Sequence, residues 1–287
     1  MNMIRKKFAL ILCLLLIPLF ILAQEADFET TEVAEGIYKF RWRGHNTMFV
    51  VTPKGIVAFD PISIEASKVF GNEIKKKAPG LSLVAIVYSH SDADHATGAN
   101  ALMESMGANN VEIIAHESAV PHIMKNADPG LPQPTTTFSN QLTINFGGRV
   151  IEFHYFGPTH TDNMIIPYIP DAGVIFTVDF VNHDRVGYRE LPGFAFPDWF
   201  NAVNELLQVP FKTVVFGHGP DGDRGSIQRQ YVYYNNLKTE VAKAISEGKS
   251  EDEAAAFIQL NEYAKWGQYE EWFPLNVRGM YRQISMK

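Results

Sequence analysis

A recurring pattern of short apolar runs constrains the fold of this 287-residue chain most strongly. Each run is four to six residues long and ends just before a side chain that can bind a metal: 83–88 before His90, 111–115 before His116, 173–178 before Asp179 and 213–216 before His218. Uniformly apolar runs of this length are typical of strands buried on both faces between helices. The pattern therefore predicts an α/β fold whose site lies at the carboxyl ends of the strands.

The remaining stretches predict the other elements of the fold. Further strands are expected at 36–42, 48–52, 55–59 and 150–156, and helices at 64–78, 95–106, 118–126, 198–207, 226–244 and 251–258. Residues 24–31 are interpreted as a polar start, and the proline-rich stretch 128–137 as an exposed loop. The aromatic residues between 263 and 272 favour a C-terminal helix packed on the sheets. No linker is long enough to divide residues 24–287, which predicts one domain with C-terminal helices.

The N-terminus has the pattern of a targeting segment. Arg5, Lys6 and Lys7 precede an apolar run at 8–22, which ends at Ala23. This order is typical of a secretory signal peptide over residues 1–23, and it predicts a periplasmic or secreted protein without stable membrane association after cleavage. A retained anchor is the alternative, because Ile21 at position −3 is not a small residue.

Charge and cysteine content exclude several classes of function. The net charge is −7, and it becomes −10 without residues 1–23, which argues against nucleic-acid binding and favours a small-molecule substrate. The single cysteine, Cys13, lies in the apolar run of the signal segment. The mature chain therefore has no disulfide, thiolate ligand or cysteine nucleophile.

The sequence His90-Ser91-Asp92-Ala93-Asp94-His95 is the sharpest motif for chemistry. In a loop that leaves a strand, positions 90 and 92 project to one side while 94 and 95 diverge, so one segment can serve two adjacent metal ions. Histidine and aspartate are ligands for zinc, iron or manganese. His160, Asp179 and His218 follow in order along the chain.

These motifs resemble the metallo-β-lactamase superfamily, whose signature is His-x-His-x-Asp-His followed by a histidine, a bridging aspartate and a final histidine. The segments 157–163 and 217–219 look like the third and last ligand motifs, and Asp60 matches a support position near the site. The resemblance spans about residues 31–220. It implies a four-layer αβ/βα sandwich with the site at one edge of the paired sheets.

The resemblance also implies a ligand set for two metal ions, most simply two Zn²⁺. The first ion would be held by His90, Asp92 and His160. The second would be held by Asp94, His95 and His218, with Asp179 bridging the two ions.

Two positions depart from the family pattern. The second histidine of the signature is Asp92 here, so the first site is more anionic. Three interpretations follow: two zinc ions at altered affinity, harder ions such as iron or manganese, or a single metal ion. Flavodiiron proteins of the same superfamily carry a glutamate at this position. Asp179 stands where zinc β-lactamases typically have cysteine or serine, which favours the glyoxalase II and lactonase-like hydrolases.

The implied function is metal-dependent hydrolysis by an exported enzyme. A metal-bound hydroxide would attack a carbonyl-type substrate such as a lactam, lactone, ester or thioester, and phosphodiesters also fit. Asp94 is the predicted catalytic residue, which orients the nucleophile and passes a proton to the leaving group. The alternatives are a non-haem iron oxidoreductase on the same fold, favoured by Asp92, and a non-catalytic metal-binding protein.

Other polar residues are weaker candidates. Asn163 belongs to the third ligand motif, and His183 and Tyr188 follow Asp179 closely enough to line a pocket. His116 begins a helix, which favours a supporting role over that of a ligand. His45 and His122 belong to no pattern.

Overall fold

The computed structural model describes residues 27–196 and 198–286, so the predicted signal peptide lies outside the described residues. Within them, seven strands form the first sheet in the order β1 (Phe28–Ala34), β2 (Ile37–Trp42), β3 (His45–Thr52), β4 (Gly55–Phe59), β5 (Leu83–Val87), β6 (Glu112–His116) and β7 (Thr136–Phe138). Five strands form the second sheet in the order β12 (Thr213–Phe216), β11 (Val174–Thr177), β10 (Ile166–Ile169), β9 (Arg149–His154) and β8 (Gln141–Phe146).

The parallel strands carry most of the predicted site residues just beyond their carboxyl ends. β4, β5, β6 and β7 pair in parallel, and so do β11 and β12. The other pairs, β1 to β4 and β8 to β11, are antiparallel. The expected arrangement of strand ends at one edge therefore applies to the parallel part of each sheet.

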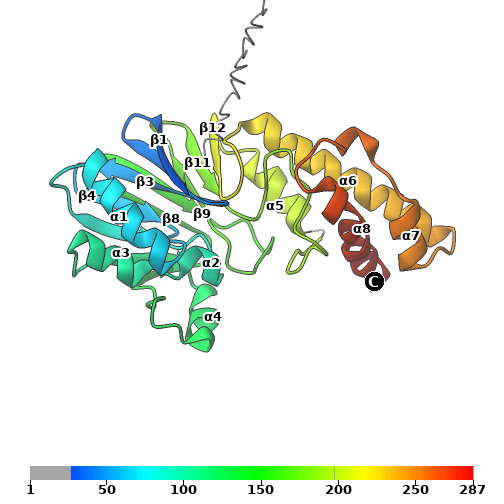
Figure 1. The fold of residues 1–287 in the computed structure, drawn as a ribbon, viewed down its shortest axis with the longest axis horizontal. Helices are drawn as coiled ribbons and strands as arrows, with labels where there is room; N and C mark the ends of the chain where they lie inside the picture. The colour runs from blue at the N-terminus through cyan, green and yellow to red at the C-terminus, as the bar shows by residue number, and fades with distance from the viewer. Residues whose placement is uncertain (1–26, 197, 287) are drawn as a thin grey trace, which may run out of the picture.

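Helices cover the outer faces of both sheets (Figure 1). The α-helices of the described residues are α1 (Ile64–Lys77), α2 (Ala93–Ala96), α3 (Ala99–Met106), α4 (Ala119–Asn126), α5 (Asp198–Leu206), α6 (Arg224–Ser246), α7 (Glu251–Phe257) and α8 (Tyr269–Ser285), of which α7 and α8 pack beside α6. The helices α1 and α3 lie along the first sheet, whereas α6, α7 and α8 gather at the opposite end of the molecule. None of the helices in the described ranges is long and apolar enough to cross a membrane.

The side chains of β4 show why the layers form. Ile56 and Ala58 face the core that β2 to β5 share with α1 and α3. Val57 and Phe59 face the core between the two sheets, opposite residues of β9 to β12. A strand buried on both faces needs apolar side chains at every position, which is what the apolar runs supply. A third core joins β10 and β11 to α5, α6 and α8, so the four-layer αβ/βα sandwich is confirmed.

Several elements differ from the sequence prediction. β1 lies in the stretch interpreted as a polar start, and β7 lies at the end of the predicted loop 128–137. Both are edge strands, and their partial exposure permits the polar residues that hide them in the sequence. The predicted helix 95–106 is two helices, α2 and α3. The chain turns at Gly98, where a Cβ atom would lie 2.6 Å from the backbone oxygen of Ser63.

Candidate metal centre

The structure brings the predicted ligands together at the carboxyl ends of the parallel strands. The loop after β5 carries the motif residues 90–95, while Asp179 and His218 directly follow β11 and β12. His160 comes from the loop between β9 and β10. The carboxyl ends of parallel strands share one edge, so short loops place these distant residues around a single point.

The first group consists of His90, Asp92 and His160. One ligand atom of each lies within 4.8 Å of the other two. The Oδ2 atom of Asp92 is 3.6 Å from Nε2 of His90 and 3.3 Å from Nε2 of His160. His90 is fully buried, whereas Asp92 and His160 reach the solvent.

The second group consists of Asp94, His95, Asp179 and His218. The Nε2 atom of His95 is 3.4 Å from Oδ2 of Asp179 and 3.9 Å from Oδ2 of Asp94. The Nε2 atom of His218 is 3.0 Å from Oδ1 of Asp179. Asp179 also approaches Nε2 of His90 at 3.8 Å, so its carboxylate lies between the two groups.

These residues fit divalent metal ions. The Nε2 atoms of His90 and His95 are buried and have no hydrogen-bond partner among the described residues. Bonds of 2.0–2.2 Å in a tetrahedral site place neighbouring ligand atoms about 3.3–3.6 Å apart. The distances of Asp92 to His90 and His160, and of Asp179 to His95, fall in this range. A mixed imidazole and carboxylate set suits such an ion.

Hydrogen bonds outside the groups set the tautomers of two imidazoles. The Ser89 hydroxyl donates to Oδ2 of Asp60 at 2.6 Å, so it accepts at 2.9 Å from Nδ1 of His90. Nδ1 of His218 donates to the backbone oxygen of Gly44 at 2.7 Å. In the neutral form of both rings Nε2 is therefore the unprotonated atom, and it faces the carboxylates.

The carboxylates are ionised far below neutral pH. The imidazoles of His160 and His90, which lie 3.3 Å and 3.6 Å from its Oδ2 atom, hold the pKa of Asp92 far below its usual range. Burial alone raises the pKa of Asp179, but the imidazoles of His95 and His218 beside it outweigh burial and lower that pKa strongly. A hydrogen bond from His45 lowers the pKa of Asp94 to about 2. The centre thus holds three negative charges among its imidazoles.

Two of the predicted supporting residues stand directly behind the centre. Asp60 is fully buried, accepts a hydrogen bond from the backbone nitrogen of Ser89 at 2.7 Å, and lies 3.6 Å from Nδ1 of His95. Asn163 is also buried, and its Oδ1 atom accepts from the backbone nitrogen of Ser91 at 2.9 Å. Both residues hold the loop that carries the motif.

His116 and His183 lie away from the centre. The ring of His116 stacks on Tyr155 at 3.8 Å, and its Nε2 bonds to the backbone oxygen of Ser139. His183 packs edge-on against Phe216 and contacts Ser226, and it is not among the residues that line the cavity. The loop turns the ring of His183 toward the start of α6, and its role in a pocket stays a prediction.

A cavity of about 930 Å³ opens over the metal groups. Metal-group residues line one side, and the loop after β11 lines the other with Asn182, Arg185 and Tyr188. Gly267 and Gln268, from the segment before α8, complete the wall. Arg185 and Gln268 were not predicted as site residues, because nothing in their local sequence marks them.

Arg185 is held by the C-terminal segment. Its guanidinium carbon lies 4.8 Å above the ring of Trp272 in α8, and backbone hydrogen bonds join Asp184 and Val186 to Gly267. No carboxylate pairs with this guanidinium in the part of the chain that the structure describes. Burial lowers the pKa of Arg185, although it remains a cation.

His45 is the candidate ligand that sequence reasoning missed. It opens β3, and one of its ring nitrogens lies within 4.8 Å of nitrogens of His95 and His218. Its Nε2 atom is 3.4 Å from Oδ2 of Asp94. The strand that carries it has no site motif, so only the packing of the two sheets reveals it.

Comparisons with known proteins agree with this architecture. Residues 40–218, more than half of the chain, match the model of the metallo-beta-lactamase superfamily. Over 208 residues the chain is 26% identical to a Bacillus subtilis (strain 168) protein named "Probable metallo-hydrolase YqgX", a match that covers 67% of this chain and 93% of that protein.

Two solved structures share the fold. A metallo-beta-lactamase from Pontibacter korlensis is 22% identical with a TM-score of 0.63, covering 73% of this chain and 99% of its own. The stereoselective inverting sec-alkylsulfatase Pisa1 from Pseudomonas sp. is 17% identical with a TM-score of 0.74, covering 89% of this chain and 50% of its own. The chain belongs to the metallo-beta-lactamase superfamily and is a metallo-hydrolase of that family.

Proposed function

We propose that the chain is a dinuclear hydrolase that works with two zinc ions. The observation that supports this most is the position of Asp179, whose carboxylate oxygens lie 3.0–4.0 Å from imidazole nitrogens of both groups. His90, Asp92 and His160 would hold one ion, and Asp94, His95 and His218 would provide ligands for the other. A carboxylate in this position suits a bridge between two ions.

The donors favour zinc over harder ions. Four imidazoles surround three carboxylates, and zinc accepts such mixed sets readily. When bound, the ions supply Lewis acidity and lower the pKa of a coordinated water to about 7. The chain's own contribution is to orient the imidazoles through Asp60, Ser89 and Gly44, which fixes their tautomers before substrate arrives.

Asp94 is the proposed catalytic residue. Its side chain is 62% exposed, lines the cavity, and is ionised at neutral pH because its pKa is about 2. A carboxylate so placed accepts a proton from the attacking water and can deliver it to the leaving group.

The cavity supports a small anionic substrate. Its volume of about 930 Å³ suits a small molecule, and Arg185, which pairs with no carboxylate among the described residues, lines the same cavity as the metal groups. We propose a carbonyl-type substrate, namely a lactam, lactone, ester or thioester, that carries an anionic group beside the bond to be cleaved. The guanidinium would orient that anionic group, while Asp94 would transfer the proton from the attacking water to the leaving group.

A non-haem iron enzyme is the second candidate. The group of His90, Asp92 and His160 contains two histidines and one carboxylate, a ligand combination found in iron(II) oxygenases. The carboxylate of Asp92 is the feature that favours this alternative.

Export of a single mature domain, residues 24–287, also remains part of the proposal. It is supported by the basic and apolar pattern of residues 1–23. N-terminal sequencing of the protein recovered from the periplasm or medium should begin at Gln24. A chain recovered only from the membrane fraction with its first residues intact would overturn the cleavage site.

The deciding experiment is metal analysis by mass spectrometry on protein purified without chelators or a metal-binding tag. Two zinc ions per chain, together with hydrolysis of an ester, lactone, thioester or lactam panel that chelation abolishes, are expected. Iron as the main metal, with no hydrolysis, would replace the hydrolase proposal with the oxidoreductase. Absence of bound metal together with absence of turnover would overturn both.

A further inference from the structure

We propose that His45 is a ligand of the second metal ion, together with His95, His218 and Asp179. This assignment rests on the metal-binding function proposed above and changes its ligand set. His45 lies outside the His-x-Asp-x-Asp-His motif. Its strand, β3, is near the start of the family match, whereas His218 is at the end of that match. It adds a third imidazole to the second group.

The ring nitrogens of His45, His95 and His218 lie close enough together for one ion to bind all three. The ring of His45 lies 4.8 Å from the ring of His218 and 5.4 Å from that of His95, between centroids. One nitrogen of each of these three residues lies within 4.8 Å of the other two. Asp179 contacts His95 at 3.4 Å and His218 at 3.0 Å. Asp179 thus contacts two of the three imidazoles, and together the four residues would supply the four ligands of a tetrahedral site.

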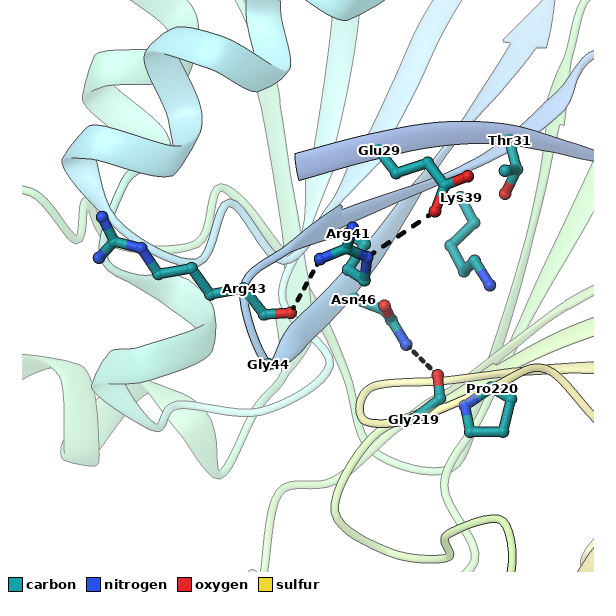
Figure 2. A pocket seen from close by; sticks show the side chains of 9 residues that line it. All are labelled: Glu29, Thr31, Lys39, Arg41, Arg43, Gly44, Asn46, Gly219 and Pro220. Carbon is teal, nitrogen blue, oxygen red and sulfur yellow. Dashed lines mark hydrogen bonds and ion pairs between the residues drawn. The ribbon is translucent and has the colours of Figure 1, made fainter. Parts of the chain in front are cut away.

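The hairpin between β2 and β3 is tied to the loop that carries His218. The backbone nitrogen of Asn46 donates to Gly217 at 2.7 Å. The side-chain amide of Asn46 donates to the backbone oxygens of Phe216 at 2.9 Å and Gly219 at 2.7 Å, as Figure 2 shows for Gly219. Gly44 accepts the hydrogen bond of Nδ1 of His218. The residues on both sides of His45 thus hold it beside His218.

The ring of His45 makes few polar contacts that could stabilise the fold. Among the described residues its one polar partner is Asp94, at 3.4 Å, and its side chain is 30% exposed at the cavity wall. The hairpin around it is held by backbone bonds of β2 and β3 and by Asn46. Replacing the ring should therefore leave the fold intact, which makes the assignment testable.

The additional imidazole also bears on Asp94, which has been assigned both as a metal ligand and as the residue that transfers a proton. If His45, His95, His218 and Asp179 complete the second site, Asp94 is not needed as a fourth ligand. Its exposed carboxylate is then available for proton transfer. The two sites then differ in their ligands. The first has two imidazoles and the carboxylate of Asp92, whereas the second has three imidazoles, and Asp179 lies between the two. Zinc should fill the nitrogen-rich second site first.

The test compares His45→Ala and His45→Gln with a control, His122→Ala. His122 is a half-exposed histidine of α4, and it pairs with Asp162 in the loop before β10. Each full chain is stripped of metal and titrated with Zn²⁺ against a chromophoric chelator, and with Co²⁺ followed by visible absorption. The melting temperature of the metal-free protein reports the fold.

For the wild type and the His122 control we expect two bound ions per chain. For both His45 variants we expect one ion to be bound as before, the other to bind at least about 100-fold more weakly, and the Co²⁺ bands of that ion to change. The metal-free melting temperature should stay the same. Glutamine can still hydrogen-bond to Asp94, so it separates a ligand from a residue that only positions Asp94.

Three outcomes would overturn the assignment. Two ions bound by His45→Ala with wild-type affinity and an unchanged Co²⁺ spectrum would show that His45 is no ligand. Full affinity in His45→Gln with loss in His45→Ala would show that it acts through Asp94. A wild-type chain that binds no ion would overturn the proposed metal centre itself, which distinguishes that failure from the first two.

Discussion

The buried carboxylate of Asp60 lies 3.6 Å from Nδ1 of His95, behind the ring whose Nε2 faces Asp179. The same carboxylate accepts two hydrogen bonds from Ser89, which in turn accepts one from His90. One aspartate at the end of β4 therefore supports an imidazole in each metal group. Burial lowers the pKa of His95, but the charges of Asp179 and Asp60 outweigh it and raise that pKa well above its ordinary value.

Asp60→Asn should weaken metal binding without unfolding the chain. An amide nitrogen in place of Oδ2 cannot accept from the Ser89 hydroxyl, and the substitution also removes the negative charge 3.6 Å from Nδ1 of His95. Loss of such supporting bonds typically lowers metal affinity about 10–100-fold. Zinc competition against a chelator measures this, with the exposed Asp171→Asn as control. Unchanged affinity would show that the imidazoles orient themselves.

With His45 in the second ligand set, Asp94 is not needed as a ligand, so Asp94→Ala should abolish most turnover while metal content stays near that of the wild type. Positioned acid and base groups contribute about 10²–10⁴-fold to rate, so kcat should fall by that factor on any substrate the enzyme accepts. His183→Ala is the matched control, because His183 does not line the cavity. An equal loss in both variants would mean that the role assigned to Asp94 is too narrow.

Arg185→Ala should raise KM more than it lowers kcat for anionic substrates. A hydrogen bond to a charged group contributes about 1.5–3 kcal/mol, so KM should rise roughly 10–150-fold, with little change for uncharged esters. The control is Arg189→Ala, an exposed arginine on the same loop whose guanidinium lies over Tyr188. Equal effects on charged and neutral esters would exclude an anion site at Arg185.

Glu73→Gln should lower stability by about 1–2 kcal/mol at neutral pH. Burial raises the pKa of Glu73, but hydrogen bonds from Lys76 and Thr30 outweigh it and hold that pKa below its usual value. A lowered folded pKa stabilises the fold above the unfolded pKa of about 4.3, and this contribution is lost as pH falls through the folded pKa.

Urea unfolding at several pH values measures the difference between wild type and Glu73→Gln. It should be full at pH 7 and vanish in acid below the folded pKa of Glu73. The exposed Glu104→Gln on α3 serves as control and should show no such difference at either pH. A difference that persists in acid would assign the effect to packing and not to charge.

Local sequence patterns determined much of this protein. The apolar runs at 55–59, 83–88, 173–178 and 213–216 predict buried strands, because a strand covered on both faces must be apolar at every position. The motif from His90 to His95 predicts ligands on one loop, since its spacing is a local property. The four-layer fold followed from the resemblance of the ordered motifs to a known superfamily.

Tertiary structure alone decided which distant residues complete the site. His45 reaches His218 because the bonds of Asn46 join the hairpin at the start of β3 to the loop after β12. Arg185 faces the cavity because Trp272 and Gly267, outside the family match, hold its loop in place. Such contacts depend on how the sheets and helices pack, and neither periodicity nor spacing along the chain records them.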